Sequence, residues 1–335
     1  MQWYTMGVDL GSTTAKAAIV DEDGEMVSSA VIQMGAVSRQ AVTVAIDRVL
    51  EQAGLQPSDI ARTISTGYGR RLVPSADKTF TEITCHARGA AALSPGVRLV
   101  IDIGGQDSKA IAVDEDGLVD RFALNDRCAS GTGRFFDVLC RALEVDLGEV
   151  VDLALDGAEN LEVSSMCATF AETEVISLLA QGAEPADISA SVHRSVSART
   201  LGLVAQVGKV FPAVMTGGVA KNRALVQFLS DSLGQELVVL ENPQIAGALG
   251  AALIARDEHR GQLDLAVADI DTDRQLVAQR SGGLKDCTGC DGHLGDGQPH
   301  DHGHAAGAQG AGRGPVPVIL RTDNLTAAGP GPAGR

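Results

Sequence analysis

The same alternation of apolar and polar positions occurs twice in the chain, at positions 93 residues apart. An apolar run at residues 6–10 leads into a turn rich in Gly, Ser and Thr, and a second apolar run then ends in an Asp-Gly turn. A second copy begins at residue 99, and 9 of the 16 positions from Asp9 to Gly24 are identical to those from Asp102 to Gly117. Asp-Gly between two apolar strands is typical of a β-hairpin. The chain is therefore predicted to contain two related hairpins. Either the duplication is purely structural, or the two hairpins face one ligand.

Apolar residues at helical spacing indicate helices between and after these hairpins. They are predicted over residues 37–50, 135–143, 170–180, 223–233 and 244–256. Strands that alternate with helices predict the α/β class, and a length of 335 residues suggests two domains. We expect one domain over 1–95, with the final helix 244–256 packed back on it, and a second domain over 96–243.

The composition changes near residue 257. Residues 280–335 contain 14 Gly and 5 Pro, too many for a segment that buries an apolar core. Residues 257–335 are therefore predicted to be a largely disordered tail. The tail contains Cys287 and Cys290 together with His293, His300, His302 and His304. These side chains are either incidental or a Zn²⁺ or Ni²⁺ site.

Charge and cysteine content restrict the function. The formal net charge is −16, which argues against nucleic-acid partners and anionic membrane surfaces, because both need clustered basic residues. No apolar run is long enough to span a membrane. Six cysteines are too few for a disulfide scaffold, so we expect a reducing, cytoplasmic compartment.

The two hairpin turns have the chemistry of a polyphosphate site. Backbone N–H groups and hydroxyls suit phosphate oxygens, and strand-ending carboxylates suit Mg²⁺. The first turn offers Ser12, Thr13, Thr14 and Lys16, and the second offers Gly104, Gly105 and Gln106. The Mg²⁺ candidates are Asp9 and Asp102. Asp107 is expected either to orient an attacking water or to cap the turn.

This arrangement resembles the actin, sugar-kinase and Hsp70 ATPase superfamily. The resemblance implies a two-domain actin-like fold with duplicated phosphate-binding hairpins and ATP or ADP in the cleft between the domains. It also implies a third element that borders adenosine. The candidates for that element are Gly217, Gly218, Asn222 and Gln244.

Two cysteines do not belong to a plain kinase pattern. Cys128 and Cys167 each precede a predicted helix, where a thiol has a depressed pKa, and thiolates are the ligands of iron–sulfur clusters. Two cysteines supply only half of the usual four ligands, and a two-fold dimer would supply the rest. The alternative is that they are unrelated buried thiols. Cys85 and Cys140 are expected to be core or surface residues, and His193 a packing or surface residue.

Five motifs resemble the activators of 2-hydroxyacyl-CoA dehydratases and the ATPase subunits of benzoyl-CoA reductase. They are Asp9-Leu-Gly-Ser-Thr, Thr66-Gly-Tyr-Gly-Arg70, Asp102-Ile-Gly-Gly-Gln-Asp107, the segment Asn125–Phe135 around Cys128, and Ser165–Ile176 around Cys167. The resemblance extends over about residues 4–256.

The resemblance implies an ATPase coupled to electron transfer in anaerobic CoA-thioester metabolism. Cys128 and Cys167 would hold one 4Fe–4S cluster that bridges a homodimer. Ferredoxin or flavodoxin would supply one electron, and a dehydratase or reductase component would accept it. Two alternatives remain open. One is a redox-free small-molecule kinase of the same superfamily, and the other is a nucleotide-gated binding module of the Hsp70 type, which would need a peptide-binding domain.

Overall fold

The computed structural model describes residues 2–34, 37–125, 131–158, 161, 163 and 168–261. Cys128, Cys167 and nearly all of the predicted tail, with Cys287 and Cys290, lie outside the described residues. In the described part, no helix is long and apolar enough to cross a membrane.

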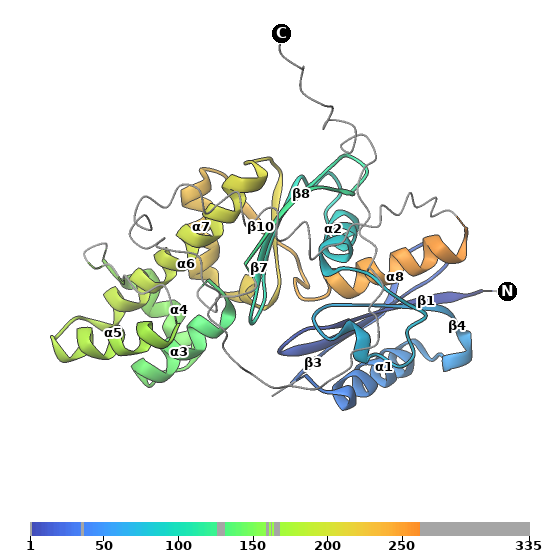
Figure 1. Ribbon diagram of the computed structural model, residues 1–335, viewed down its shortest axis with the longest axis horizontal. Helices are drawn as coiled ribbons and strands as arrows, with labels where there is room; N and C mark the ends of the chain where they lie inside the picture. The colour runs from blue at the N-terminus through green and yellow to red at the C-terminus, as the bar shows by residue number, and fades with distance from the viewer. Residues whose placement is uncertain are drawn as a thin grey trace, which may run out of the picture.

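Two five-stranded sheets form the centre of the molecule, and they have the same topology (Figure 1). The first has the order β3-β2-β1-β4-β5 and the second the order β8-β7-β6-β9-β10. The strands of the first are β1 (Tyr4–Leu10), β2 (Thr14–Val20), β3 (Met26–Gln33), β4 (Ile60–Thr66) and β5 (Lys78–Thr79). Those of the second are β6 (Leu99–Ile103), β7 (Ser108–Val113), β8 (Val119–Asn125), β9 (Ala213–Thr216) and β10 (Leu237–Val239).

The duplication extends to the pairing of individual residues. In each sheet the first three strands are antiparallel, and the first strand also pairs in parallel with the fourth. Asp9 is opposite Lys16 in the first hairpin, and Asp102 is opposite Lys109 in the second. The predicted α/β architecture with two related hairpins is confirmed.

The helices form layers on both faces of the sheets. The helices are α1 (Arg39–Ala53), α2 (Glu82–Leu93), α3 (Gly133–Leu143), α4 (Leu147–Asp156), α5 (Ala168–Ala180), α6 (Pro185–Val207), α7 (Arg223–Leu233) and α8 (Ala246–His259). Three short 3₁₀ turns, Pro57–Asp59, Arg70–Leu72 and Gly218–Lys221, complete the described elements.

Strand alternation decides which helix covers which face. Ala17 and Ile19 of β2 pack against α1, whereas Ala18 and Val20 point the other way and pack against α8. Likewise, Ile111 and its neighbours on one face of the second sheet pack on α2, and the opposite face packs on α6. Both faces of each sheet are therefore buried, which explains the nearly continuous apolar runs in the strands.

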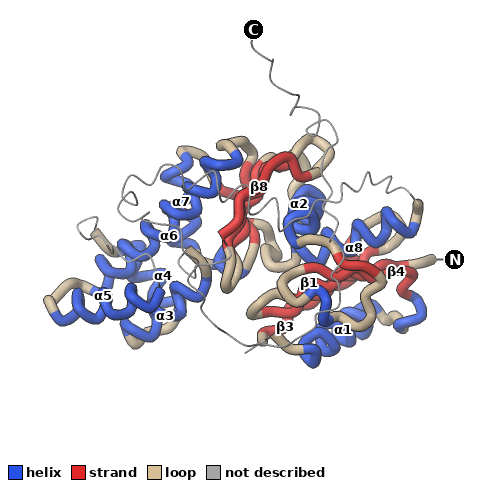
Figure 2. Tube along the Cα trace, viewed as in Figure 1, coloured by secondary structure: helices blue, strands red, loops and turns tan. Residues whose placement is uncertain are grey.

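Helices α2 and α8 lie between the two sheets and contact each other closely (Figure 2). A Cβ atom on Gly89 of α2 would lie 1.9 Å from the carbonyl oxygen of Ala246, and one on Gly250 of α8 would lie 1.8 Å from that of Cys85. Only glycine at these positions lets the two backbones approach so closely. Because α8 also packs on β1, β2 and β4, this helix returns to the first sheet.

Candidate active site

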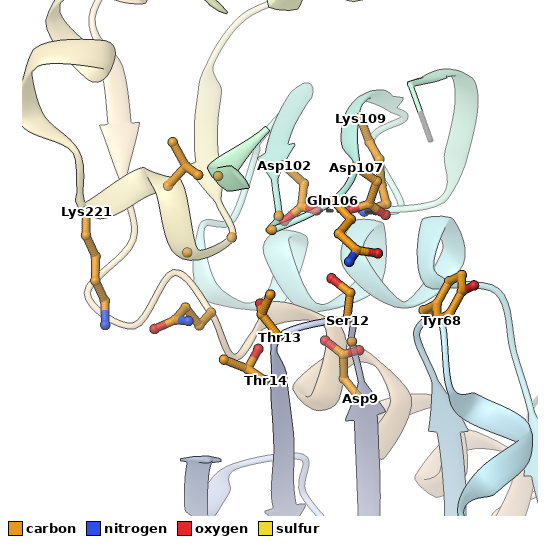
Figure 3. A pocket seen from close by; sticks show the side chains of 18 of the residues that line it. Asp9, Ser12, Thr13, Thr14, Tyr68, Asp102, Gln106, Asp107, Lys109 and Lys221 are labelled. Carbon is orange, nitrogen blue, oxygen red and sulfur yellow. Dashed lines mark hydrogen bonds and ion pairs between the residues drawn. The ribbon is translucent and has the colours of Figure 1, made fainter. Parts of the chain in front are cut away.

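A cavity of about 1090 Å³ opens between the two sheets and brings the predicted site residues together. Every candidate from sequence for the nucleotide site lines it. These are Asp9, Ser12, Thr13, Thr14, Lys16, Asp102, Gly104, Gly105, Gln106, Asp107, Gly217, Gly218, Asn222 and Gln244. Figure 3 shows the labelled side chains of the first turn opposite those of the second. Their individual roles stay predictions.

The first turn joins β1 to β2. The backbone N–H of Gly11 donates to the carbonyl oxygen of Thr14 at 3.0 Å, and that of Met34 donates to Thr13 at 2.8 Å. Lys16 does not extend freely into the cavity, because its Nζ lies 2.9 Å from Asp9 Oδ2. The cross-strand register places this ion pair at the base of the turn.

The second turn repeats this arrangement and meets the first. The N–H of Gly104 donates to the carbonyl oxygen of Asp107 at 2.9 Å, and Lys109 Nζ lies 2.9 Å from Asp102 Oδ2. A Cβ atom on Gly105 would lie 2.5 Å from the Thr13 methyl carbon. The two turns therefore touch across the cavity, which favours two hairpins that face one ligand over a purely structural duplication.

The ammonium of Lys109 is almost completely buried among three carboxylates. Its Nζ lies 2.8 Å from Asp107, 2.9 Å from Asp102 and 3.5 Å from Glu82. Burial alone would lower the pKa of Lys109, but the carboxylates of Asp102, Glu82 and Asp107 raise it well above its usual value. Lys109 therefore stays charged, and its positive charge offsets much of the negative charge of these carboxylates.

The two aspartates of the repeat, Asp9 and Asp102, differ in the polar partners that their carboxylates have. Asp102 Oδ1 accepts a hydrogen bond from the Thr216 hydroxyl at 2.8 Å and lies 3.3 Å from His86 Nδ1. Burial by itself raises the pKa of Asp102, but His86, Lys109 and Thr216 outweigh it and hold the pKa below its usual value. Asp9 is equally buried and forms an ion pair with Lys16.

Sequence reasoning missed two cavity residues on α2, Glu82 and His86. Burial raises the pKa of Glu82 to about 7, although Lys109 opposes the shift. Burial also lowers the pKa of His86, in spite of Asp102. Glu82 and His86 are four residues apart just after the N-cap Thr81, so they share one helix face. The spacing of four residues between Glu82 and His86 is visible in the sequence and could have indicated that both lie on one helix face.

His86 lies between the two halves of the site. A Cβ atom on Gly247, at the start of α8, would lie 2.9 Å from His86 Nε2 and 2.8 Å from Asp9 Oδ2. The other ring nitrogen faces Asp102. One imidazole therefore approaches the aspartates of both hairpins.

The third predicted element follows β9. Gly217 has φ +86°, its N–H donates to Pro243 O at 2.8 Å, and a Cβ atom there would lie 2.3 Å from Ile103 O. Only glycine fits this position. Asn222 caps α7 through its side-chain oxygen, which accepts the Leu225 N–H at 3.0 Å. This element lines the cavity and includes Lys221 (Figure 3).

Helix α3 begins on the second turn. The N–H of Gly133 donates to Gly104 O at 2.8 Å, and that of Arg134 donates to Gly105 O at 3.0 Å. Because the carbonyl oxygens of the turn point toward α3, the helix start is tied directly to a predicted phosphate turn.

The cysteines that the structure describes are poor metal ligands. Cys85 lies in the core between α2 and α8, and burial raises the pKa of its thiol to about 12. Cys140 is partly buried against the core of the second sheet, and burial raises its pKa as well. Within the described ranges, no group of three or more His, Cys, Asp or Glu side chains could hold a metal ion.

The cavity has the features that Mg²⁺ and a polyphosphate require. The first hairpin turn supplies hydroxyls, both turns supply backbone, and Asp9 and Asp102 lie at their bases. Asp102 already accepts from Thr216 and pairs with Lys109, so water-mediated contact fits it better than direct ligation.

Comparison with known proteins agrees with this geometry. The model of the BadF/BadG/BcrA/BcrD ATPase family matches residues 6–255. The activator of lactoyl-CoA dehydratase of Anaerotignum propionicum is 44% identical over 252 residues, which cover 75% of this chain and 97% of that protein. A benzoyl-CoA reductase subunit of Thauera aromatica is 32% identical over 265 residues, covering 76% and 94%.

A solved structure of a dehydratase activator is also similar to this chain. The activator of 2-hydroxyisocaproyl-CoA dehydratase from Clostridium difficile, with bound ADPNP, superposes with a TM-score of 0.72 at 40% identity, covering 77% of this chain and 96% of that one. The predicted actin-like ATPase fold is thereby confirmed. The family match extends over most of the chain and includes both hairpins and the Gly-Gly turn. The chain belongs to the BadF/BadG/BcrA/BcrD ATPase family.

Proposed function

We propose that this protein is an ATP-dependent activator that delivers one electron to a 2-hydroxyacyl-CoA dehydratase. The observation that carries the proposal is a cavity faced by two phosphate-type turns, in a chain 44% identical to a dehydratase activator over 97% of that protein's length. The identity to the benzoyl-CoA reductase subunit is lower, at 32%. Electron delivery to a reductase is therefore the second candidate function.

In this proposal the two turns bind the phosphates. Ser12, Thr13 and Thr14 lie on one side of the polyphosphate, and Gly104, Gly105 and Gln106 on the other. Mg²⁺ would neutralise phosphate charge beside Asp9 and Asp102, mainly through water. Gly217, Gly218, Asn222 and Gln244 border adenosine.

Asp107 is proposed to orient the attacking water. Its Oδ2 lies 2.8 Å from Lys109 Nζ, which holds the carboxylate in place beside the second turn. The same contact also suits the alternative role of Asp107, a turn residue that anchors Lys109.

Cys128 and Cys167 are proposed to supply two of the four thiolates of one 4Fe–4S cluster, with the other two from a second copy of the chain. Such a cluster, when bound, supplies a one-electron carrier at low potential. Ferredoxin or flavodoxin is the proposed donor. Support for coupling to ATP comes from the N–H groups of Gly133 and Arg134, which bind the second turn directly after the Cys128 segment.

The test is anaerobic purification followed by electron transfer. We expect a brown protein with absorbance near 400 nm that Cys128→Ser removes, and reduction of a dehydratase component only when ATP and a reduced ferredoxin are present. Parallel reactions contain a benzoyl-CoA reductase core or candidate small-molecule phosphate acceptors. A colourless protein that phosphorylates one of those acceptors would establish the redox-free kinase instead.

A further inference from the structure

His193 lies in the middle of α6, completely buried behind the cavity wall. Its Nδ1 is 2.8 Å from the carbonyl oxygen of Ser189, and its Nε2 is 2.9 Å from the side-chain nitrogen of Asn222. A carbonyl oxygen only accepts, so Nδ1 carries the hydrogen and Nε2 accepts from the Asn222 amide. Both ring nitrogens are thus satisfied, and this assigns one tautomer.

Asn222 is fixed in one orientation by these contacts. Its Oδ1 accepts the N–H of Leu225 at 3.0 Å and caps α7, while its own backbone N–H donates to Val219 O at 2.9 Å. A flipped amide would place its oxygen against His193 Nε2 and its NH₂ against the Leu225 N–H. The bond to His193 therefore selects the amide orientation that caps α7.

Packing alone does not explain a histidine at this position. The ring lies 4.7 Å from that of Phe136 on α3 and 6.2 Å from that of Phe228 on α7, both measured between centroids. A phenylalanine would fill such an aromatic site with no polar atom to satisfy. Burial lowers the pKa of His193 to about 4, so the ring contributes a neutral hydrogen-bond acceptor rather than a charge.

We propose that His193 is a positioning residue of the nucleotide site. By holding the Asn222 amide, it orders the Gly217–Asn222 segment and the first turn of α7 at the adenosine end of the cavity. His193 itself does not line the cavity, whereas Asn222 and Phe136 do. The inference rests on the proposed function only in taking the ligand to be an adenine nucleotide.

The test compares two substitutions in the full-length protein. His193→Phe retains a ring between Phe136 and Phe228 but removes the acceptor, whereas His193→Gln supplies a carbonyl oxygen that can accept from Asn222. Titration calorimetry with ADP should show binding five- to tenfold weaker for His193→Phe and within about twofold of wild type for His193→Gln. In steady-state ATP hydrolysis, His193→Phe should raise KM and change kcat less than twofold.

A mutant cycle with Asn222 isolates the coupling between the two side chains. Asn222→Ser keeps a helix-capping oxygen but lacks the amide that donates to His193. If the two residues act through their shared hydrogen bond, adding His193→Phe to Asn222→Ser weakens ADP binding by no more than twofold further. Phe228→Leu is the packing control, and it should leave ADP binding within twofold of wild type.

Two results would overturn the inference. One is wild-type ADP affinity in His193→Phe, and the other is equal weakening by His193→Phe, His193→Gln and Phe228→Leu, which would assign the effect to packing. A wild-type protein that binds no ADP would overturn the proposed function, and this inference with it.

Discussion

The backbone N–H of Gly133 donates to the carbonyl oxygen of Gly104 at 2.8 Å, and this bond joins the turn of the second hairpin to helix α3. The contact leaves little room, because a Cβ atom on Gly133 would lie 3.2 Å from that oxygen and 3.3 Å from the Cα of Gly105. Any movement of the turn when nucleotide binds must therefore move the start of α3 or break the bond.

This contact makes Gly133 sensitive to substitution. Gly133→Val adds two methyl groups beyond the crowded Cβ position, which should push the turn away from α3 and reduce the ATP hydrolysis rate by at least tenfold. The measurement is steady-state phosphate release at saturating ATP. Gly202→Ala is the matched control, because a Cβ atom there meets nothing within 4 Å. Equal rates in both variants would contradict the role of the contact.

The two lysines of the repeat should differ in their contribution to stability. Lys109 is 2% exposed at the side chain and contacts three carboxylates, whereas Lys16 is 13% exposed and pairs with Asp9. Removing one partner from a buried charge pair costs about 3–5 kcal/mol. We expect Lys109→Met to lower the free energy of unfolding in urea by about that amount, and Lys16→Met by clearly less. Equal losses of unfolding free energy in the two variants would show that the deeper burial of Lys109 does not increase its contribution to stability.

Glu82 should make stability depend on pH. Its pKa is about 7 in the folded protein and about 4.5 in the unfolded chain, so the folded state holds a proton that the unfolded state has lost between these values. The resulting stabilisation is complete below pH about 4.5 and is lost as pH rises through 7. Glu82→Gln keeps the side chain neutral at every pH.

The comparison is urea unfolding of both proteins from pH 4.5 to 8. Relative to wild type, Glu82→Gln should gain stability as pH rises, by at most about 3 kcal/mol across the range. If the stability of the two proteins changes with pH in parallel, the Glu82 carboxyl titrates at the same pH in the folded and unfolded states.

Gly217 should tolerate no side chain. Gly217→Ala places a methyl group 2.3 Å from Ile103 O and forces alanine to adopt φ +86°, so ADP binding should fall by at least tenfold. Gly234→Ala is the control, because Gly234 also has a positive φ, +69°, but a Cβ atom there would meet nothing within 4 Å. Calorimetric titration with ADP tests both variants, and similar losses would show that the effect does not come from the contact between residue 217 and Ile103.

The duplicated pattern made much of the site predictable. Asp9 and Asp102 occur at matching places in two similar hairpins, so their convergence on one cavity followed from the repeat. Helix α7 begins and ends at the predicted residues, because Asn222 and Gly234 are strong local caps.

Tertiary contacts account for what was missed. Glu82 and His86 lie on a helix whose partners come from both sheets, and nothing local shows which way its polar face points. His193 was expected to be a packing or surface residue. It is buried, and its bond to Asn222 joins positions 29 residues apart on separate helices.

The shared strand order and register have a consequence for the origin of the cavity. Asp9 lies opposite Lys16 and Asp102 lies opposite Lys109, so the two hairpins that face the cavity share one pairing pattern. A half-length ancestor that paired with itself would have built both walls from one hairpin. In the single chain the two walls differ, with hydroxyls at Ser12 and Thr13 on one side and glycines at 104 and 105 on the other. An asymmetric ligand can thereby be bound in one direction only.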